Sequence, residues 1–367
     1  MRVDALADLL KGAVQEGGFP GAVALVAVGD TVVLQMACGL ANLFTRRPVT
    51  VDTLFDLASL TKPMATTAAV MHLCRRQELS TTTPLGVLLP LFKGTDKAAI
   101  TVGQLLTHQS GLPAYRPYYL RLRHLRPGER STHLKAWLVA EPLCYQPGAR
   151  TVYSDLGFMV LAWVVMQCSG QPLAHFLRDH IYGPLGLERL FFPAFETGPD
   201  DPGFAACEYS LWRGRLIDGT VHDDNADAAA DLQGQAGLFG DAASAHRLLA
   251  EMLAAYNGVA NRFSPEVVRH FWARPCDDQR ALGFDVPAAH AASCGRRFSP
   301  HTIGHLGFTG TSLWVDVEQS IIVILLTNRV HPFANNTRIR AFRPVFHDAV
   351  MDWLLKKPLS INRPLID

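Results

Sequence analysis

Several motifs that would identify other protein classes are missing from this sequence. The seven cysteines are scattered along the chain: Cys38, Cys74, Cys144, Cys168, Cys207, Cys276 and Cys294. They never form a C-x-x-C pair, so we expect reduced thiols rather than a disulfide framework or a zinc site. H-E-x-x-H and G-x-S-x-G are also absent, which disfavours a zinc protease and an α/β-hydrolase. We therefore expect no metal and no cofactor.

Long apolar runs and blocks of like charge are absent too. The longest apolar stretch, residues 156–166, is well short of the roughly 20 residues that span a bilayer, so no membrane span is expected. The 34 basic and 33 acidic residues nearly balance, and no Lys- or Arg-rich block supplies the field that attracts nucleic acid. Asp4 and Asp8 interrupt the apolar core that a secretory signal needs, so we expect a cytoplasmic protein.

What the sequence does contain is a globular composition with β-prone runs at both ends. Of the 367 residues, 49% are hydrophobic and 18% are charged, which is typical of a protein with a large buried core. After an amphipathic first helix, residues 21–28 and 31–38 flank Gly29-Asp30 and predict a hairpin. Residues 310–317 and 321–327 predict two more strands, and the spacing of 337–355 predicts a closing helix.

The pattern predicts an α/β (α+β) fold. An antiparallel sheet is built from both chain ends and flanked by helices, and a mostly helical lobe is inserted between the two halves of the sheet. We expect residues 1–60 plus 290–367 to form the sheet lobe and 61–289 the helical lobe of one catalytic unit, with Pro- and Gly-rich loops near 110–130, 192–220 and 283–300. A site is expected in the cleft between the lobes.

A serine and a lysine three residues apart carry the first chemical signal. Ser59 and Lys62 form the only S-x-x-K match in the chain, and the apolar run after Pro63 predicts a helix beginning near Ser59. This spacing places the amine beside the hydroxyl on one helix face, as a base beside a nucleophile. Apolar surroundings lower the pKa of a lysine, so we expect Lys62 to accept the serine proton. The alternative is a helix cap followed by a surface lysine.

A tyrosine supplies a second candidate for proton transfer. Tyr153 is the only tyrosine that stands two residues before an Asp or Asn, here Asp155, and it follows the turn at Pro147-Gly148. A tyrosine fixed on such a turn can pass a proton to a leaving group or activate water when cations lie nearby. The alternative is a tyrosine packed at the edge of the core.

A glycine-rich stretch at residues 304–312 is the third element. Its glycines allow a substrate to approach a strand edge closely. The amide of Phe308 can pair with that of Ser59 as an oxyanion hole. His305 can polarise the Tyr153 hydroxyl or bind a substrate group, and the alternative for it is a strand-end histidine at the surface.

These three segments, in this order, resemble the serine β-lactamase, penicillin-binding protein and esterase superfamily, in its class C-like branch (peptidase family S12 type). The resemblance covers nearly the whole chain. Further stretches look like the same branch: residues 100–113, 170–173 and 184–187. Others are similar to a narrower group that includes cytoplasmic N-acetylmuramoyl-L-alanine amidases: residues 219–226, 234–239 and 326–332.

The resemblance implies a role for each matching residue. The catalytic residues would be Ser59 as nucleophile, Lys62 as its base and Tyr153 in proton transfer, with the amides of Ser59 and Phe308 as the oxyanion hole. The substrate would contact Gln109, Asp155, His222, His305, Gly307 and Thr309. For His222 the alternative is an Asx-rich turn with local hydrogen bonds.

Three departures from the family pattern shape the expected activity. Asp155 stands where relatives carry Asn, Leu306 replaces a hydroxyl residue, and His305 replaces a permanent cation, which weakens the grip on a β-lactam or D-Ala carboxylate. We therefore expect a serine hydrolase that forms an acyl-enzyme and hydrolyses a small ester or a peptidoglycan-fragment amide. The alternative is a catalytically weak penicillin-binding or sensor protein of this fold, or a low-activity β-lactamase or D-Ala peptidase. The oligomeric state stays open.

Overall fold

The computed structural model describes residues 3–193, 203–229, 234–273 and 280–355, so Cys276 lies outside the described residues. The strands are β1 Gly21–Val28, β2 Thr31–Asn42, β3 Arg47–Pro48, β4 Phe55–Asp56, β5 Tyr209–Ser210, β6 Arg215–Leu216, β7 Phe239–Gly240, β8 Ile303–Leu306, β9 Ser312–Asp316 and β10 Ile321–Thr327. The α-helices are α1 Val3–Gln15, α2 Ala68–Arg75, α3 Leu85–Leu88, α4 Val102–Leu106, α5 Tyr119–Leu122, α6 Pro127–Ala140, α7 Asp155–Ser169, α8 Leu173–Leu177, α9 Asp224–Ala228, α10 Ala242–Tyr256, α11 Pro265–Trp272 and α12 Ile339–Leu355.

The main sheet joins the two ends of the chain, which confirms the predicted fold class. Its six strands run in the order β3-β2-β1-β10-β9-β8, and each neighbouring pair is antiparallel. The predicted hairpin is β1 and β2, with Gly29 in the left-handed region at its turn (φ 60°). The later pair is β9 and β10, and the closing helix is α12. The edge strands β3 and β8 were not predicted, because two to four residues give too little alternation to recognise.

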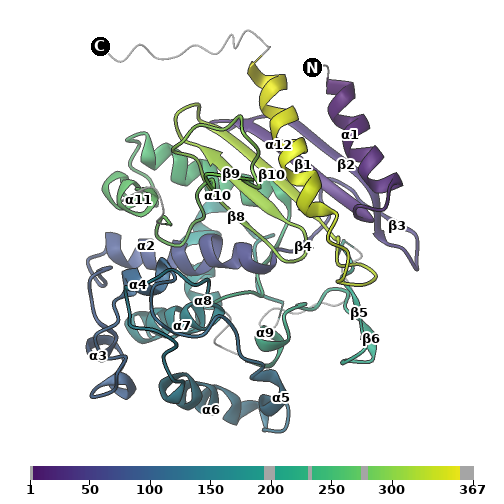
Figure 1. Ribbon diagram of the computed structural model, residues 1–367. Coiled ribbons are helices and arrows are strands. Elements are labelled where there is room, and N and C mark those ends of the chain that lie inside the picture. The colour runs from purple at the N-terminus through teal and green to yellow at the C-terminus, as the bar shows by residue number, and fades with distance from the viewer. Residues whose placement is uncertain (1–2, 194–202, 230–233, 274–279, 356–367) are drawn as a thin grey trace, which may run out of the picture.

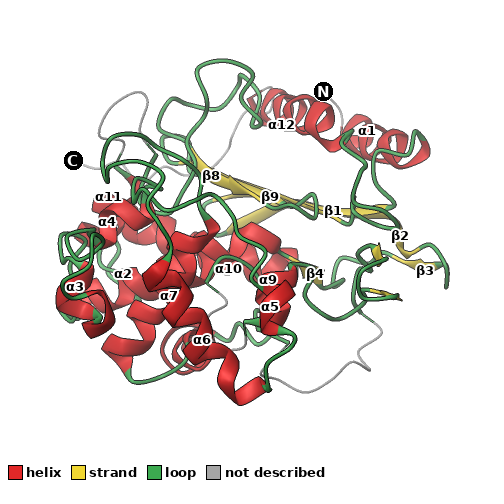
Figure 2. Ribbon diagram, turned by 60° about the horizontal axis from the view of Figure 1, so that its bottom comes forward, coloured by secondary structure: helices red, strands yellow, loops and turns green. Residues whose placement is uncertain are grey.

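Helices cover both faces of the sheet, so its central strands are buried on both sides (Figure 2). Successive side chains of a strand point to opposite faces. Val23, Leu25 and Ala27 of β1 therefore face the large core beneath the sheet, whereas Ala22, Ala24 and Val26 pack with α1 and α12. Because α1 and α12 lie side by side on that outer face, the two ends of the described chain are also close in space (Figure 1).

The helical part of the chain lies below the opposite face of the sheet, around α7 (Figure 2). Ser154 caps α7 by accepting from the Gly157 N–H, and Gly170 ends the helix in the left-handed region (φ 72°). The lobe boundaries near residues 60 and 290 stay a prediction. The loop expected around 110–130 holds α5 and the first residues of α6, since Pro127 fits the first turn of a helix.

Among the described residues, no single helix has the length and apolar character to cross a bilayer. One pair, Asp155–Ser169 with Leu173–Leu185, meets the criterion jointly but is bent by 63° at its break. Most of α7 is buried in the core, as expected for a central helix of a globular fold.

Candidate active site

Ser59 lies on a tight turn that leads into α2. The segment starts with a 3₁₀ turn, Ala58–Leu60, and continues through a π turn, Lys62–Thr67, into the helix. Ala58 has a φ of 49°, which a residue with a side chain adopts only when its surroundings hold it there. Its amide donates to Oδ1 of the buried Asp56 at 2.8 Å. This turn leaves the Ser59 side chain partly exposed.

The Lys62 amine lies between three acceptors. Nζ is 3.0 Å from Ser59 Oγ, 2.9 Å from the carbonyl oxygen of Gln235 and 2.8 Å from Oδ1 of Asp155. The lysine side chain is fully buried, and 21% of the Asp155 side chain is exposed. Three acceptors match the three N–H donors of a protonated amine.

The expectation of a lowered Lys62 pKa is wrong. Burial does lower the pKa of this amine, but Asp155 and Tyr153 raise it by more, so it ends above the ordinary value for lysine. The apolar helix sequence around Lys62 predicts that burial lowers the pKa. It does not predict that Asp155 raises the pKa, because this carboxylate lies at the start of α7. Lys62 is therefore a cation in the resting protein.

Two cations and two histidines surround the Tyr153 ring. Lys62 Nζ lies 4.8 Å from the ring centroid and the Arg280 guanidinium carbon lies 5.3 Å from it. The ring centroids of His108 and His305 are 4.5 and 6.0 Å away. The structure thus brings together the tyrosine, the lysine and His305, as the sequence predicts.

Both histidines beside Tyr153 are buried and neutral. Burial, together with the charges of Arg280 and Lys62, lowers the pKa of each well below the ordinary value. His108 Nδ1 accepts from the Ser154 N–H at 3.0 Å, whereas His305 Nδ1 lies 2.8 Å from the Leu306 carbonyl oxygen and donates to it. His305 therefore supplies an imidazole at this position and no positive charge.

The stretch that follows β8 is seated directly against the turn that carries Ser59. The hydroxyl of Thr309 donates to the carbonyl oxygen of Asp56 at 2.7 Å, and that of Thr311 donates to the carbonyl oxygen of Leu57 at 3.1 Å. A Cβ at Gly307 would lie only 2.7 Å from the same Leu57 oxygen, so only glycine fits there. Among the described residues no acceptor faces the Phe308 N–H.

Of the other predicted substrate contacts, His222 is bonded to the segment around Ser59, whereas the side chain of Gln109 is bonded to nearby threonines. The His222 ring stacks on Phe308 with centroids 5.5 Å apart, and its backbone amide donates to Oδ2 of Asp56 at 2.7 Å. The Gln109 side chain is bonded instead to the hydroxyls of Thr107 and Thr151. No hydrogen bond joins it to Ser59 within the described part of the chain.

Four residues of the site were not selected from the sequence: Asp56, His108, Gln235 and Arg280. Asp56, His108 and Gln235 lie inside or beside stretches that match the family, and only this position in the sequence indicates that they belong to the site. Arg280 has no such signal. Its ion-pair partner, Asp285, forms an antiparallel bridge with Gly304 of β8, and this pairing brings Arg280 to the site. In the described ranges no three His, Cys, Asp or Glu side chains could hold a metal ion.

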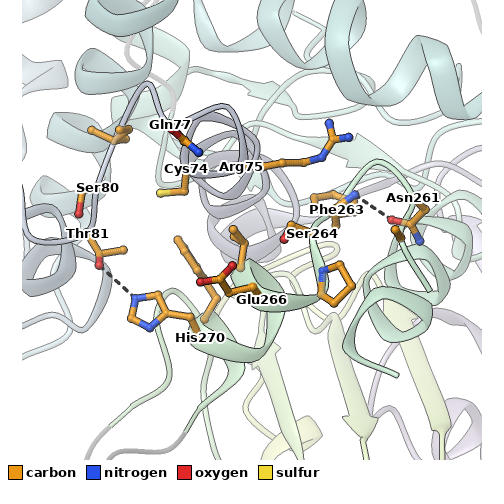
Figure 3. A pocket seen from close by; sticks show the side chains of 15 residues that line it. Cys74, Arg75, Gln77, Ser80, Thr81, Asn261, Phe263, Ser264, Glu266 and His270 are labelled. Atoms are coloured by element: carbon orange, nitrogen blue, oxygen red, sulfur yellow. Dashed lines mark hydrogen bonds between the residues drawn. The ribbon is translucent and has the colours of Figure 1, made fainter. Parts of the chain in front are cut away.

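A separate cavity of about 570 Å³ lies between α2 and α11 (Figure 3). Cys74, Glu266 and His270 line it, and His270 bonds the Thr81 hydroxyl at 3.1 Å. At 1.5 Å per helical residue, Cys74 lies about 20 Å along the helical segment from Ser59. None of the predicted site residues lines this cavity.

Comparisons with known proteins identify the family of this chain. The family profile described as Beta-lactamase matches residues 6–343. The chain belongs to the Beta-lactamase family, and it is a serine hydrolase. An N-acetylmuramyl-L-alanine amidase of Bacillus subtilis (strain 168) is 31% identical over 348 residues, covering 86% of this chain and 78% of that protein. A Salmonella schwarzengrund (strain CVM19633) protein named "Putative D-alanyl-D-alanine carboxypeptidase" is 31% identical over 355 residues, covering 87% and 81%.

Among solved structures, EstCE1, titled a hydrolase with promiscuous acyltransferase activity, superposes with a TM-score of 0.71. The match covers 93% of this chain and 98% of EstCE1 at 22% identity. At that identity the likeness supports the fold and leaves the substrate open. The names of the relatives refer to different bonds, so they do not decide between an amide and an ester substrate.

Proposed function

We propose that Ser59 is the nucleophile of this hydrolase and forms an acyl-enzyme. The contact of 3.0 Å between Ser59 Oγ and Lys62 Nζ, in the only S-x-x-K of the chain, carries the proposal. Both the partial exposure of Ser59 and the strained Ala58 before it suit a side chain that has to meet a substrate. Ser59 then attacks the substrate first and water hydrolyses the product of that attack second, as in covalent catalysis. The intermediate between the two steps is an ester on Ser59.

Because Lys62 is already protonated, it accepts the serine proton only if it gives one away. Asp155, 2.8 Å from Nζ, is placed to take that proton. As the Ser59 O–H bond breaks, a new N–H bond forms on Lys62, and another proton passes from Nζ to the Asp155 carboxylate. Asn, the usual residue of the family at this position, has no base for the last transfer. The departure at Asp155 thus fits a serine–lysine–aspartate relay.

The tetrahedral intermediate is held by the amides of Ser59 and Phe308. The contacts of Thr309 and Thr311 with Asp56 and Leu57 fix the Phe308 segment beside the Ser59 turn, as an oxyanion hole requires. Tyr153, in contact with Lys62, passes a proton to the leaving group. His222, His305 and Gly307 line the space next to Phe308 and Tyr153 in which the substrate binds.

We propose a small ester or a muropeptide-like amide as the substrate, acted on in the cytoplasm. The amidase relative supports the amide, and EstCE1, whose fold is similar, is titled a hydrolase with promiscuous acyltransferase activity. The neutral His305 supports an acyl group that needs no cation, because a β-lactam or D-Ala carboxylate would meet an uncharged imidazole. A penicillin or D-Ala peptidase activity is the alternative.

Labelling and turnover test the nucleophile directly. The protein is incubated with a fluorophosphonate, and the intact mass and the modified peptide are measured; we expect one adduct on Ser59. Turnover is compared for a p-nitrophenyl ester, an N-acetylmuramoyl-L-Ala peptide, benzylpenicillin and a D-Ala-D-Ala peptide. Ser59→Ala should abolish labelling and turnover, while Ser264→Ala, a partly exposed serine of the separate cavity, should keep both. Full activity in Ser59→Ala would place the nucleophile elsewhere.

A further inference from the structure

A buried arginine contacts the backbone on both sides of Phe308, the proposed oxyanion-hole residue. Arg343 is on α12, on the outer face of the sheet (Figure 1), and only 6% of it is exposed. Its NH2 group donates to the carbonyl oxygen of Gly307 at 3.1 Å and to that of Thr311 at 2.7 Å. Gly307 also donates its own N–H to the Thr311 oxygen at 2.7 Å. The guanidinium therefore closes the turn that presents Phe308.

Within the described residues, no carboxylate compensates the charge of this arginine. None forms an ion pair with Arg343, and its Nε has no acceptor there. Burial lowers the pKa of the guanidinium to about 10, with repulsion from Arg329 and Arg340, so it stays charged at neutral pH. His347, one helical turn on, is neutral, because burial and Arg343 lower its pKa to about 3.

A buried cation that binds only carbonyl oxygens is costly, because a protein normally pairs or neutralises such a group. An apolar side chain would fill the same space without that cost. The cost of burying Arg343 is explained if a neighbouring group uses its charge. The neighbouring group that can do so is the peptide unit between Gly307 and Phe308.

The Gly307 carbonyl and the Phe308 N–H belong to one peptide group. A charged donor on the carbonyl oxygen pulls electron density from the amide and strengthens its N–H as a donor. We propose that Arg343 is an electrostatic positioning residue of the oxyanion hole, which polarises the Gly307–Phe308 peptide and fixes its direction. This inference rests on the proposed function. Arg329, which binds the carbonyl of Phe308 at 2.8 Å, acts on the following peptide group.

The test compares Arg343→Met, which removes the charge, with Arg343→Lys, which keeps it. Arg340→Met, an exposed arginine of the same helix, is the matched control. For each protein we measure kcat and KM on the p-nitrophenyl ester, the rate of Ser59 labelling by the fluorophosphonate, whose phosphoryl oxygen occupies the oxyanion hole, and the melting temperature. If Arg343→Met does not fold, Arg343→Gln replaces it, because Gln keeps a donor without a charge.

We expect Arg343→Met to lower kcat and the labelling rate by about 10- to 100-fold, less than the roughly 100- to 1,000-fold loss of a direct oxyanion donor. KM should change by less than about threefold, since the oxyanion forms only in the transition state. Arg343→Lys should recover most of the rate. Equal loss in Arg343→Met and Arg343→Lys, or none in Arg343→Met or Arg343→Gln, overturns the inference. Absence of labelling in the unmodified protein would refute the proposed function instead.

Discussion

Replacing Asp155 by Asn should destabilise the fold more than replacing the buried lysine with which it pairs. Asp155→Asn leaves Lys62 with no counter-charge at 0% exposure, and breaking a buried ion pair in this way costs about 3–5 kcal/mol. Lys62→Met leaves the partly exposed Asp155 unpaired, which water stabilises, so the expected cost is about 1 kcal/mol or less. The double variant has no charge to bury and should resemble Lys62→Met.

Denaturant unfolding followed by tryptophan fluorescence at pH 7 measures this cycle. The free energies of the native protein, the two single variants and the double variant give a coupling energy, which should be at least about 2 kcal/mol. Asp155→Asn should also lower kcat by about 100-fold, the size of a typical general acid–base contribution, because the last acceptor of the relay is lost. Additive stabilities, with Asp155→Asn costing under about 1 kcal/mol, would refute the ion-pair argument.

The same pair has a defined pH signature. Because the folded pKa of Lys62 is raised, its contribution to stability is fully present below the unfolded value of about 10.4 and is lost as pH rises through the folded pKa. The stability advantage of the native protein over Lys62→Met, which has no amine to titrate, should therefore be constant from pH 7 to about 10 and shrink above that range. A difference that shrinks instead between pH 7 and 9 would contradict the raised pKa.

Two further perturbations have expected outcomes. Gly307→Ala places a Cβ 2.7 Å from the Leu57 oxygen and against Thr311, so kcat/KM should fall by about 100-fold or more. Gly12→Ala, in α1, meets no atom within 4 Å and should leave kcat/KM unchanged. Burial lowers the pKa of His72 to about 4 and that of His347 to about 3. The two neutral histidines therefore contribute stability above the unfolded pKa of about 6.5, and this contribution is lost as the pH falls. Urea unfolding should show about 4 kcal/mol less stability at pH 5 than at pH 7 from these two groups together; no change would contradict their neutrality.

The fold was largely predictable because its signals are long and local. The 13-residue amphipathic helix α1 and the eight-residue strand β1 of small and branched apolar residues can each be recognised from the sequence without a partner. The strand β8 is not readable in that way: its four residues, which include a glycine and a histidine, become a strand only because β9 pairs with them. The same holds for β4, which exists through its pairing with β7.

The site was predictable where chemistry follows from spacing and not where it follows from distant contacts. Ser59 and Lys62 are one turn apart, so their contact is nearly fixed by the helix. The charge state of Lys62 depends on Asp155, which the sequence places on a different helix, and its role as an ion-pair partner was not foreseen. Arg343 could not be found at all from spacing, because its partners are backbone carbonyls, and any sequence has those.

The distribution of charge around Ser59 supports the proposed ester or amide substrate over one that is held by its carboxylate. Near Tyr153 the positive charges are matched, since Lys62 is paired with Asp155 and Arg280 with Asp285, and the two histidines there are uncharged. Behind the Phe308 segment the guanidinium of Arg343 is unmatched within the described residues. In the proposed oxyanion hole this charge would act on the oxygen that becomes negative during attack, and the paired cations near Tyr153 leave little positive charge for a substrate carboxylate. A site arranged in this way lowers the barrier to acylation without requiring an anionic group on the acyl donor.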